Sequence, residues 1–264
     1  MKKVRSRDGT EIAFEKSGAG HALILVGGAL SNRAVALPLL RLLSPSFSVI
    51  AYDRRGRGDS GDADSYAVEC EIDDLHALIA EAGGTAFIYG HSSGGALALE
   101  GARRGLGISR LALYEPPFIV DETRPPVGDD FPDRITKLLA SGRRGEAVEL
   151  FMTEAVLVPP GVVAGMKASP MWPGLEGLAD TLLYDLSVMG RDMGGRPPAK
   201  GRWASVTMPT LVMDGGASPP WARNSVEALA AALPNARRLT LEGQNHGATP
   251  EALAPVLESF FLAS

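Results

Sequence analysis

The sequence predicts an α/β protein with a mostly parallel central sheet, helices on both faces and a helical lid insertion. Two observations carry this prediction. Short apolar runs recur along the chain and alternate with amphipathic helical stretches, which is typical of buried parallel strands covered by helices. The alternation stops after Glu115 and resumes near Thr210, so the intervening block is expected to lie outside the sheet.

The first element is an expected antiparallel hairpin. Residues 2–7 and 10–16 alternate polar and apolar side chains around the turn-forming pair Asp8-Gly9. Five later strands are expected where short runs are apolar on both faces, at residues 21–26, 47–52, 85–89, 111–114 and 210–213. A last strand, between two predicted helices, is expected over residues 237–241. Amphipathic patterns predict the helices of the core over residues 30–43, 66–82, 94–105, 221–233 and 251–261.

The block between residues 116 and 205 has no convincing strand, only helical patterns and proline-rich joints. Helices are expected there over residues 133–140, 146–156, 162–168 and 175–189. No repeat or low-complexity linker separates the block from its surroundings. The sequence therefore predicts a core formed by residues 1–115 and 206–264, with residues 116–205 as a helical lid.

The composition argues against several classes of function. A net charge of −5 gives no basic footprint for nucleic acid, and the paired arginines, Arg54-Arg55 among them, are expected on solvated faces. A single cysteine, Cys70, allows neither an intramolecular disulfide nor a thiolate metal site. Neither a membrane span nor a signal peptide is recognisable. We expect a cytoplasmic protein whose partner is a small-molecule substrate; the sequence does not indicate its oligomeric state.

The motif that carries chemistry is Gly90-His91-Ser92-Ser93-Gly94. It follows a predicted strand and opens a predicted helix, which is the context of a nucleophile elbow. The turn is tight, so the residues two before and two after Ser92 are expected to need the absence of a Cβ. The Ser92 hydroxyl would then stand at a helix N-terminus, where N–H groups and the helix dipole favour negative charge.

A serine nucleophile needs a base, and His246 is the candidate. It lies in the loop of residues 242–247 after a predicted strand, and sites of α/β proteins form in such loops. His21 and His76 are expected on the surface, and the ring of His91 is expected to point away from the site. The oxyanion donors are expected to be the backbone N–H groups of Ser93 and Ala29, since Ala29 follows the glycine pair after the first core strand.

Together these motifs resemble the α/β-hydrolase superfamily, and the resemblance covers nearly the whole chain. Residues 52–60 resemble the family's aspartate-arginine-glycine loop, which implies scaffold roles for Asp53 and Arg55. The sequence departs from the family twice. The usual histidine-glycine pair is replaced by Gly27-Gly28, and Ser218 stands where the family places its catalytic acid.

Three alternatives remain open for the acid. Glu115 directly follows the predicted strand 111–114, and some members of the superfamily take their acid from the end of that strand. Asp214 precedes the glycine turn near Ser218 and is the main rival. The third alternative is a dyad of Ser92 and His246 without an acid.

The resemblance implies a cofactor-free serine hydrolase of small to medium apolar esters, lactones or thioesters. No metal-ligand spacing and no dinucleotide fingerprint is present in context. Trp172 of the lid and Trp221, which stands beside Pro219-Pro220 in the core, are the candidates for substrate contact. The lid also carries a soft apolar set that includes Met166, Met171, Met189, Met193 and Phe131. The alternatives are a C–C bond hydrolase or lyase on the same fold, and a ligand-binding protein that has lost catalysis.

Overall fold

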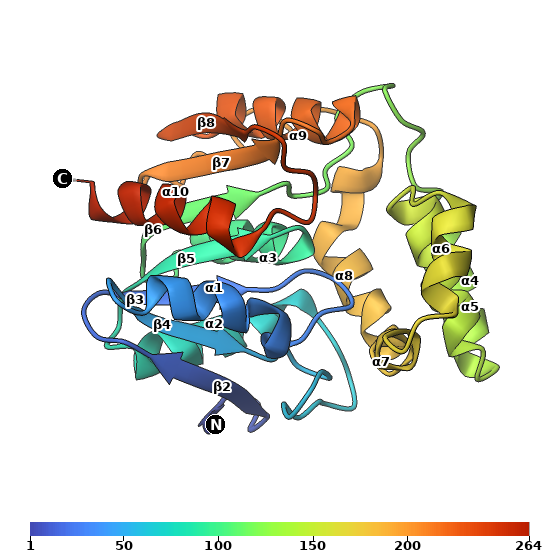
Figure 1. Ribbon diagram of the computed structural model, residues 1–264, viewed down its shortest axis with the longest axis horizontal. Helices are drawn as coiled ribbons and strands as arrows, with labels where there is room; N and C mark the ends of the chain where they lie inside the picture. Colours follow the sequence, from blue (N-terminus) through green and yellow to red (C-terminus); the bar gives the residue numbers. More distant parts are fainter. Residues whose placement is uncertain (264) are drawn as a thin grey trace.

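An eight-stranded sheet forms the centre of the molecule (Figure 1). The computed structural model describes residues 1–263, except for the side chain of Arg191. The strand order is β1-β2-β4-β3-β5-β6-β7-β8; β2 pairs antiparallel with both β1 and β4, and the other neighbours are parallel. The strands are β1 (Lys2–Arg5), β2 (Glu11–Ser17), β3 (Ala22–Val26), β4 (Ser48–Tyr52), β5 (Ala86–His91), β6 (Ile108–Tyr114), β7 (Thr210–Gly215) and β8 (Ala236–Leu241).

Each face of the sheet has its own apolar core, because successive side chains of a strand point to opposite faces. In β3, Leu23 and Leu25 belong to the core under α1 (Arg33–Leu43) and α10 (Pro250–Leu262). Ile24 and Val26 belong to the opposite core, under α2 (Val68–Glu81), α3 (Ser93–Arg103) and α9 (Pro220–Ala232). The predicted α/β class with helices on both faces is confirmed.

A helical insertion lies between the end of β6 at Tyr114 and the start of β7 at Thr210. It contains α4 (Phe131–Ala140), α5 (Arg144–Leu150), the π-helical turn η1 (Phe151–Ala155), α6 (Pro160–Lys167), α7 (Trp172–Glu176), the 3₁₀ turns η2 (Ala179–Thr181) and η3 (Gly190–Met193), and α8 (Leu182–Met189). Two apolar clusters form its own core, and α8 packs against α3 and α2 of the main body. Figure 1 shows α4, α5 and α6 on the side of α8 that is away from the sheet.

Two expectations about the fold are wrong. A single helix over residues 175–189 is not formed: α7 ends at Glu176, before Gly177, a residue that weakens helices. The pair Arg54-Arg55 is also not solvated, since both side chains are 2% exposed or less. Their acidic partners lie on other elements, α2 and α8, between 17 and 131 residues away, so a local pattern could not reveal the burial.

Other arginine pairs, such as Arg103-Arg104 and Arg143-Arg144, lie at the surface as expected. Across the described part of the chain, none of the helices combines the length and the apolar character needed to cross a membrane.

Candidate active site

Ser92 occupies a strained turn between β5 and α3. Its φ of 55° and ψ of −128° lie outside the regions that non-glycine residues favour. A Cβ on Gly90 would stand 2.6 Å from Cα of Gly95, and a Cβ on Gly94 would stand 2.4 Å from the carbonyl oxygen of Val26. Both glycines are therefore required by close backbone contacts, and they allow α3 to begin directly behind the Ser92 hydroxyl.

The structure brings Ser92, His246 and Glu115 together from three separate loops. Nε2 of His246 lies 3.1 Å from Oγ of Ser92, and Nδ1 lies 2.8 Å from Oε2 of Glu115. An ionised carboxylate can only accept hydrogen bonds. Nδ1 therefore carries the proton, and Nε2 is left to accept the hydrogen of the Ser92 hydroxyl.

Glu115 is held by the backbone around it. It adopts a positive φ of 44° directly after β6, its side chain is 1% exposed, and Oε1 accepts the N–H of Gly215 at 2.8 Å. Burial acts to raise the pKa of this carboxyl, but the hydrogen bonds from His246 and Gly215 prevail, and the net pKa lies below its usual value. The carboxyl is consequently ionised at neutral pH.

Ser218, at the family's usual acid position, lies buried beside this carboxyl and helps to lower its pKa. Among the described residues, however, its hydroxyl completes no hydrogen bond of ordinary geometry. Ser218 is therefore a polar neighbour of Glu115, and it lowers the pKa of that carboxyl less than the hydrogen bonds from His246 and Gly215 do.

Asp214 points elsewhere. Its carboxylate accepts hydrogen bonds from Arg238 at 3.1 and 3.2 Å and from the Thr240 hydroxyl at 3.2 and 3.3 Å. It is fully buried in these contacts. Of the two candidate acids, only Glu115 therefore contacts His246.

The loop after β3 lies directly against Ser92. A Cβ on Gly28 would stand 2.9 Å from Cβ of Ser92, so glycine is needed for this approach. In the part of the chain that the structure describes, neither the N–H of Ala29 nor that of Ser93 donates a hydrogen bond within the protein. Both N–H groups are thus available to an oxygen atom of a bound substrate.

His91 differs from its expectation, since its ring belongs to the site. Nε2–H of His91 donates to the carbonyl oxygen of His246 at 2.8 Å, and the two rings lie 4.9 Å apart. The Tyr114 hydroxyl holds the neighbouring carbonyl of Asn245 at 2.6 Å. Strand alternation places His91 on the α10 face, and the loop that carries His246 leads into α10, so the two meet there.

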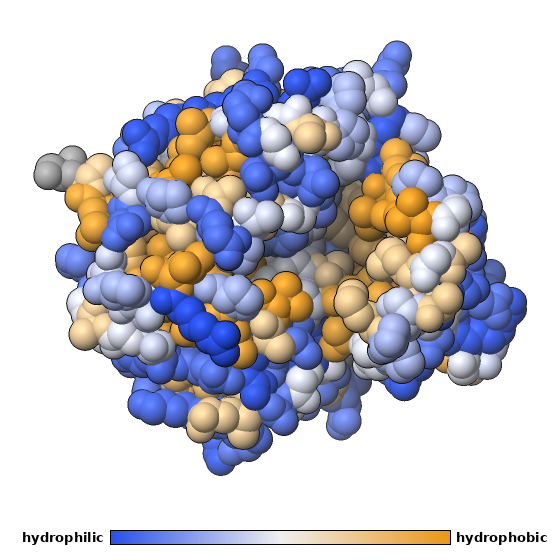
Figure 2. Space-filling model, in the orientation of Figure 1, coloured by the Kyte–Doolittle hydropathy of each residue, from blue (hydrophilic) through white to orange (hydrophobic). Residues whose placement is uncertain are grey.

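A pocket of about 870 Å³ opens above Ser92 between the core and the insertion. In the space-filling view this hollow has apolar surface at its rim (Figure 2). Trp221 lines the pocket together with Met166, Met189 and Met193. No lysine or arginine is among its described lining residues.

Trp172 does not line this pocket. It is 6% exposed and packs in a cluster with Val148 and Val163 of the insertion. Its indole N–H donates to Glu176, and it borders a separate hollow of about 560 Å³ between residues 142–146 and 167–177. Within the described residues, no group of three or more His, Cys, Asp or Glu side chains is placed to hold a metal ion.

Three residues near the site were not singled out from the sequence: Ser31, Arg57 and Asp185. Arg57 donates to the carbonyl oxygen of Gly28 at 2.7 Å, and Ser31 donates to the same oxygen at 2.6 Å. Asp185 accepts from the hydroxyl of Ser93 at 2.7 Å. The presence of Arg57 in the motif of residues 52–60 was the one available signal.

Comparison with known proteins places this geometry in a family. The chain matches the model of the alpha/beta hydrolase family over residues 19–256. An alpha/beta hydrolase from Sphaerobacter thermophilus, known from its crystal structure, is 57% identical, with a TM-score of 0.93 over 98% of this chain and 100% of that one. An esterase from Thermogutta terrifontis is 23% identical over 98% of this chain and 97% of that one, and with a TM-score of 0.74 it shares the fold.

Curated relatives are more distant. A 2-(acetamidomethylene)succinate hydrolase from Mesorhizobium japonicum is 26% identical over 77% of this chain and 73% of the relative. A non-heme haloperoxidase from Rhodococcus erythropolis is 34% identical over 48% of this chain, and the match spans about half, 49%, of that relative. Because the family match extends over most of the sheet, the elbow and the insertion, this chain is an enzyme that belongs to the alpha/beta hydrolase family.

Proposed function

We propose that the protein is a serine hydrolase of neutral, small to medium apolar esters, lactones or thioesters. The observation that supports this most strongly is the continuous hydrogen-bonded series from Ser92 through His246 to Glu115. It lies in a pocket whose lining is largely apolar. An acyl group of moderate size fits such a pocket, with its carbonyl carbon next to the Ser92 hydroxyl.

The proposed reaction begins with attack of Ser92 Oγ on the carbonyl carbon, while Nε2 of His246 takes the hydroxyl proton. The N–H groups of Ser93 and Ala29 stabilise the oxyanion of the tetrahedral intermediate, and each such donor contributes about 10²- to 10³-fold in rate. The intermediate collapses, and protonated His246 gives its proton to the leaving oxygen or sulfur atom. Water then attacks the acyl-enzyme by the same route.

The preference for neutral substrates follows from the charges around the pocket. A substrate carboxylate would lose its hydration there and would find no cationic side chain among the described lining residues. Glu115, itself ionised, would repel it. The relative from Mesorhizobium japonicum is named for a succinate derivative, and we propose that this chain differs from it in this respect.

The test is hydrolysis of p-nitrophenyl acetate, p-nitrophenyl butyrate and p-nitrophenyl hemisuccinate. The butyrate and hemisuccinate esters have the same number of acyl carbons and differ in the terminal carboxylate, so they form a matched pair. We expect wild type to hydrolyse the butyrate ester with a kcat/KM 10-fold or more above that for the hemisuccinate ester, and Ser92→Ala to abolish both activities. Equal or higher activity on hemisuccinate would contradict the charge argument, and turnover that survives Ser92→Ala would contradict the serine mechanism.

A further inference from the structure

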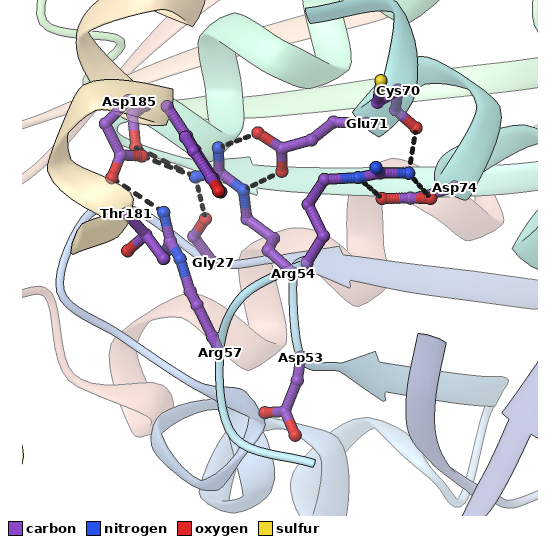
Figure 3. Close-up of polar contacts among 12 residues, drawn as sticks. Gly27, Asp53, Arg54, Arg57, Cys70, Glu71, Asp74, Thr181 and Asp185 are labelled. Carbon is purple, nitrogen blue, oxygen red and sulfur yellow. Dashed lines mark hydrogen bonds and ion pairs between the residues drawn. The ribbon is translucent and has the colours of Figure 1, made fainter. Parts of the chain in front are cut away.

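A buried network of charged side chains joins the loop after β4 to helices α2 and α8 (Figure 3). It contacts Gly28, which is next to the proposed oxyanion donor Ala29, and the side chain of Ser93, the other proposed donor. Its members are Arg54 and Arg57 from the loop after β4, Glu71 from α2, and Asp185 from α8 of the insertion. All four are 2% exposed or less. The two positive and two negative charges balance, and burial without such pairing would be very costly.

On one side the network holds the peptide that contains the N–H of Ala29. Nη1 of Arg57 donates to the carbonyl oxygen of Gly28 at 2.7 Å, while Nη2 donates to Oδ2 of Asp185 at 2.7 Å. The Gly28 carbonyl and the Ala29 N–H belong to the same planar peptide unit, so fixing one sets the direction of the other. A charged donor on the carbonyl also polarises the peptide and strengthens its N–H as a donor.

On the other side the network holds Ser93. Its hydroxyl donates to Oδ1 of Asp185 at 2.7 Å, and Nη1 of Arg54 donates to the same hydroxyl at 3.3 Å. Arg54 also donates to Oδ1 of Asp185 at 2.7 Å. Nε and Nη2 of Arg54 bind both oxygens of Glu71 at 2.6 and 2.7 Å, which fixes the guanidinium plane.

We propose that Arg57 and Asp185 are positioning residues for the oxyanion hole, and that the insertion acts on catalysis through Asp185. The two carboxylate oxygens of Asp185 serve the two donors separately: Oδ2 through Arg57 and Gly28, and Oδ1 through the Ser93 side chain. This inference rests on the proposed function, because an oxyanion hole matters only if Ser92 attacks a carbonyl.

Charge on Asp185 is retained in the folded protein. Burial tends to raise the pKa of its carboxyl, but Arg57, Arg54 and the Ser93 hydroxyl keep the net pKa below the usual value. Replacing the carboxylate by a carboxamide removes the charge and turns one acceptor into a donor. Asp185→Asn should therefore disturb both arms of the network with little change in side-chain volume.

The experiment measures the formation of a tetrahedral adduct directly. A neutral p-nitrophenyl alkylphosphonate ester reacts with Ser92 and releases p-nitrophenolate, and its phosphoryl oxygen then occupies the oxyanion hole. The variants are Asp185→Asn, Arg57→Gln and the milder Ser93→Ala, with Asp74→Asn as the matched control. Asp74 is equally buried and pairs with Arg55 of the same loop, but neither residue hydrogen-bonds to the peptides around Ser92.

We expect Asp185→Asn and Arg57→Gln to slow phosphonylation 10- to 10³-fold, with KM for p-nitrophenyl butyrate within threefold of wild type. Asp74→Asn should react at a rate within threefold of wild type, although its melting temperature should fall about as much as those of Asp185→Asn and Arg57→Gln. Ser93→Ala, which removes one neutral side chain, guards against failure of the charged variants to fold, and we expect it to be slowed 3- to 30-fold.

Each outcome has one meaning. If wild type is phosphonylated and the folded network variants react equally fast, the network is only structural and the proposed positioning role is overturned, while the serine mechanism stands. If all variants, the control included, are slowed in proportion to their loss of stability, the positioning role is likewise overturned. If wild type itself is not phosphonylated at Ser92, the proposed function fails, and the positioning role fails with it.

Discussion

Replacement of Glu115 by glutamine tests the relocated acid most directly. Two donors face this carboxyl: Gly215 N–H points at Oε1 and His246 Nδ1–H points at Oε2, each at 2.8 Å. A glutamine offers one oxygen and one NH₂ group to these two donors. The backbone N–H cannot change its character, so the oxygen should turn to Gly215 and the NH₂ group to His246.

This arrangement forces the imidazole into the wrong tautomer. With an NH₂ group facing Nδ1, the proton moves to Nε2, which can then no longer accept the proton of Ser92. In serine hydrolases, neutralising the acid in this way can cost about four orders of magnitude. His246 is 37% exposed, so water can stabilise part of the imidazolium. We therefore expect a loss of about 10²- to 10⁴-fold in kcat, or about 2.7 to 5.4 kcal/mol of transition-state stabilisation.

The assay is the hydrolysis of p-nitrophenyl butyrate at matched concentrations of folded protein. Asp214→Asn is the control, because it removes a carboxylate that is also fully buried but pairs with Arg238 rather than with His246. Its kcat should stay within threefold of wild type. A Glu115→Gln enzyme that keeps at least a third of the wild-type kcat would refute the reasoning, and a large loss in Asp214→Asn would return the role of the acid to Asp214.

Three further predictions concern single positions. Gly28→Ala should lower kcat for p-nitrophenyl butyrate at least about 10²-fold, because the new Cβ would stand 2.9 Å from Cβ of Ser92 and must move the loop after β3 that carries the Ala29 N–H. The hydrolysis rate, divided by the concentration of reactive serine found by active-site titration, measures this loss. Burial lowers the pKa of His91 from 6.5 to about 4, so the folded state is fully stabilised above pH 6.5 and loses about 3 kcal/mol of unfolding free energy as the pH falls to 4. His91→Asn should flatten that dependence in denaturant titrations. Trp221→Ala should raise KM for p-nitrophenyl butyrate, because Trp221 lines the pocket. Trp172→Ala should lower the melting temperature and leave KM unchanged, because Trp172 packs inside the insertion.

The controls and contrary results are specific to each position. For Gly28, the matched control is Gly83→Ala, since a Cβ there meets nothing within 4 Å, and its positive φ affects stability alone; equal kcat losses would contradict the steric argument. For His91, the argument fails if the wild-type free energy of unfolding is flat between pH 6.5 and 4. For the two tryptophans, a KM change in Trp172→Ala would restore its predicted contact with substrate.

The sheet was predictable because each strand is specified locally. A short run such as residues 21–26 must be buried on both faces wherever it lies, and the structure confirms it as β3. The start of β6 was missed by three residues, since Ser109 and Arg110 interrupt the apolar run while the backbone still pairs with β5. The interruption between α7 and α8, at residues 177–181, was missed because helical periodicity in the insertion continues across it.

The residues of the candidate site likewise differ in how much local sequence signal they carry. Ser92 and His246 could be proposed because each stands in a local motif at the end of a strand. The choice between Glu115 and Asp214 could not be made from the sequence, since both follow predicted strands. In the structure Asp214 is still part of β7, whereas Glu115 turns away from the end of β6 with a positive φ and faces His246. Asp185 left no local signal at all, because its partners Arg54 and Arg57 are separated from it by more than a hundred residues of chain.

The burial of Asp185 also determines which part of the insertion is free to move. Displacing α8 would strip two arginines of their shared carboxylate, and breaking such a buried pair costs about 3 to 5 kcal/mol. Substrate entry is therefore expected to use a hinge on the far side of α8, near Leu157, a pocket-lining residue with a φ of 64° and a 40% exposed side chain. In hydrogen exchange, the amides of α8 should stay protected along with the sheet, while those of α6 exchange through local opening.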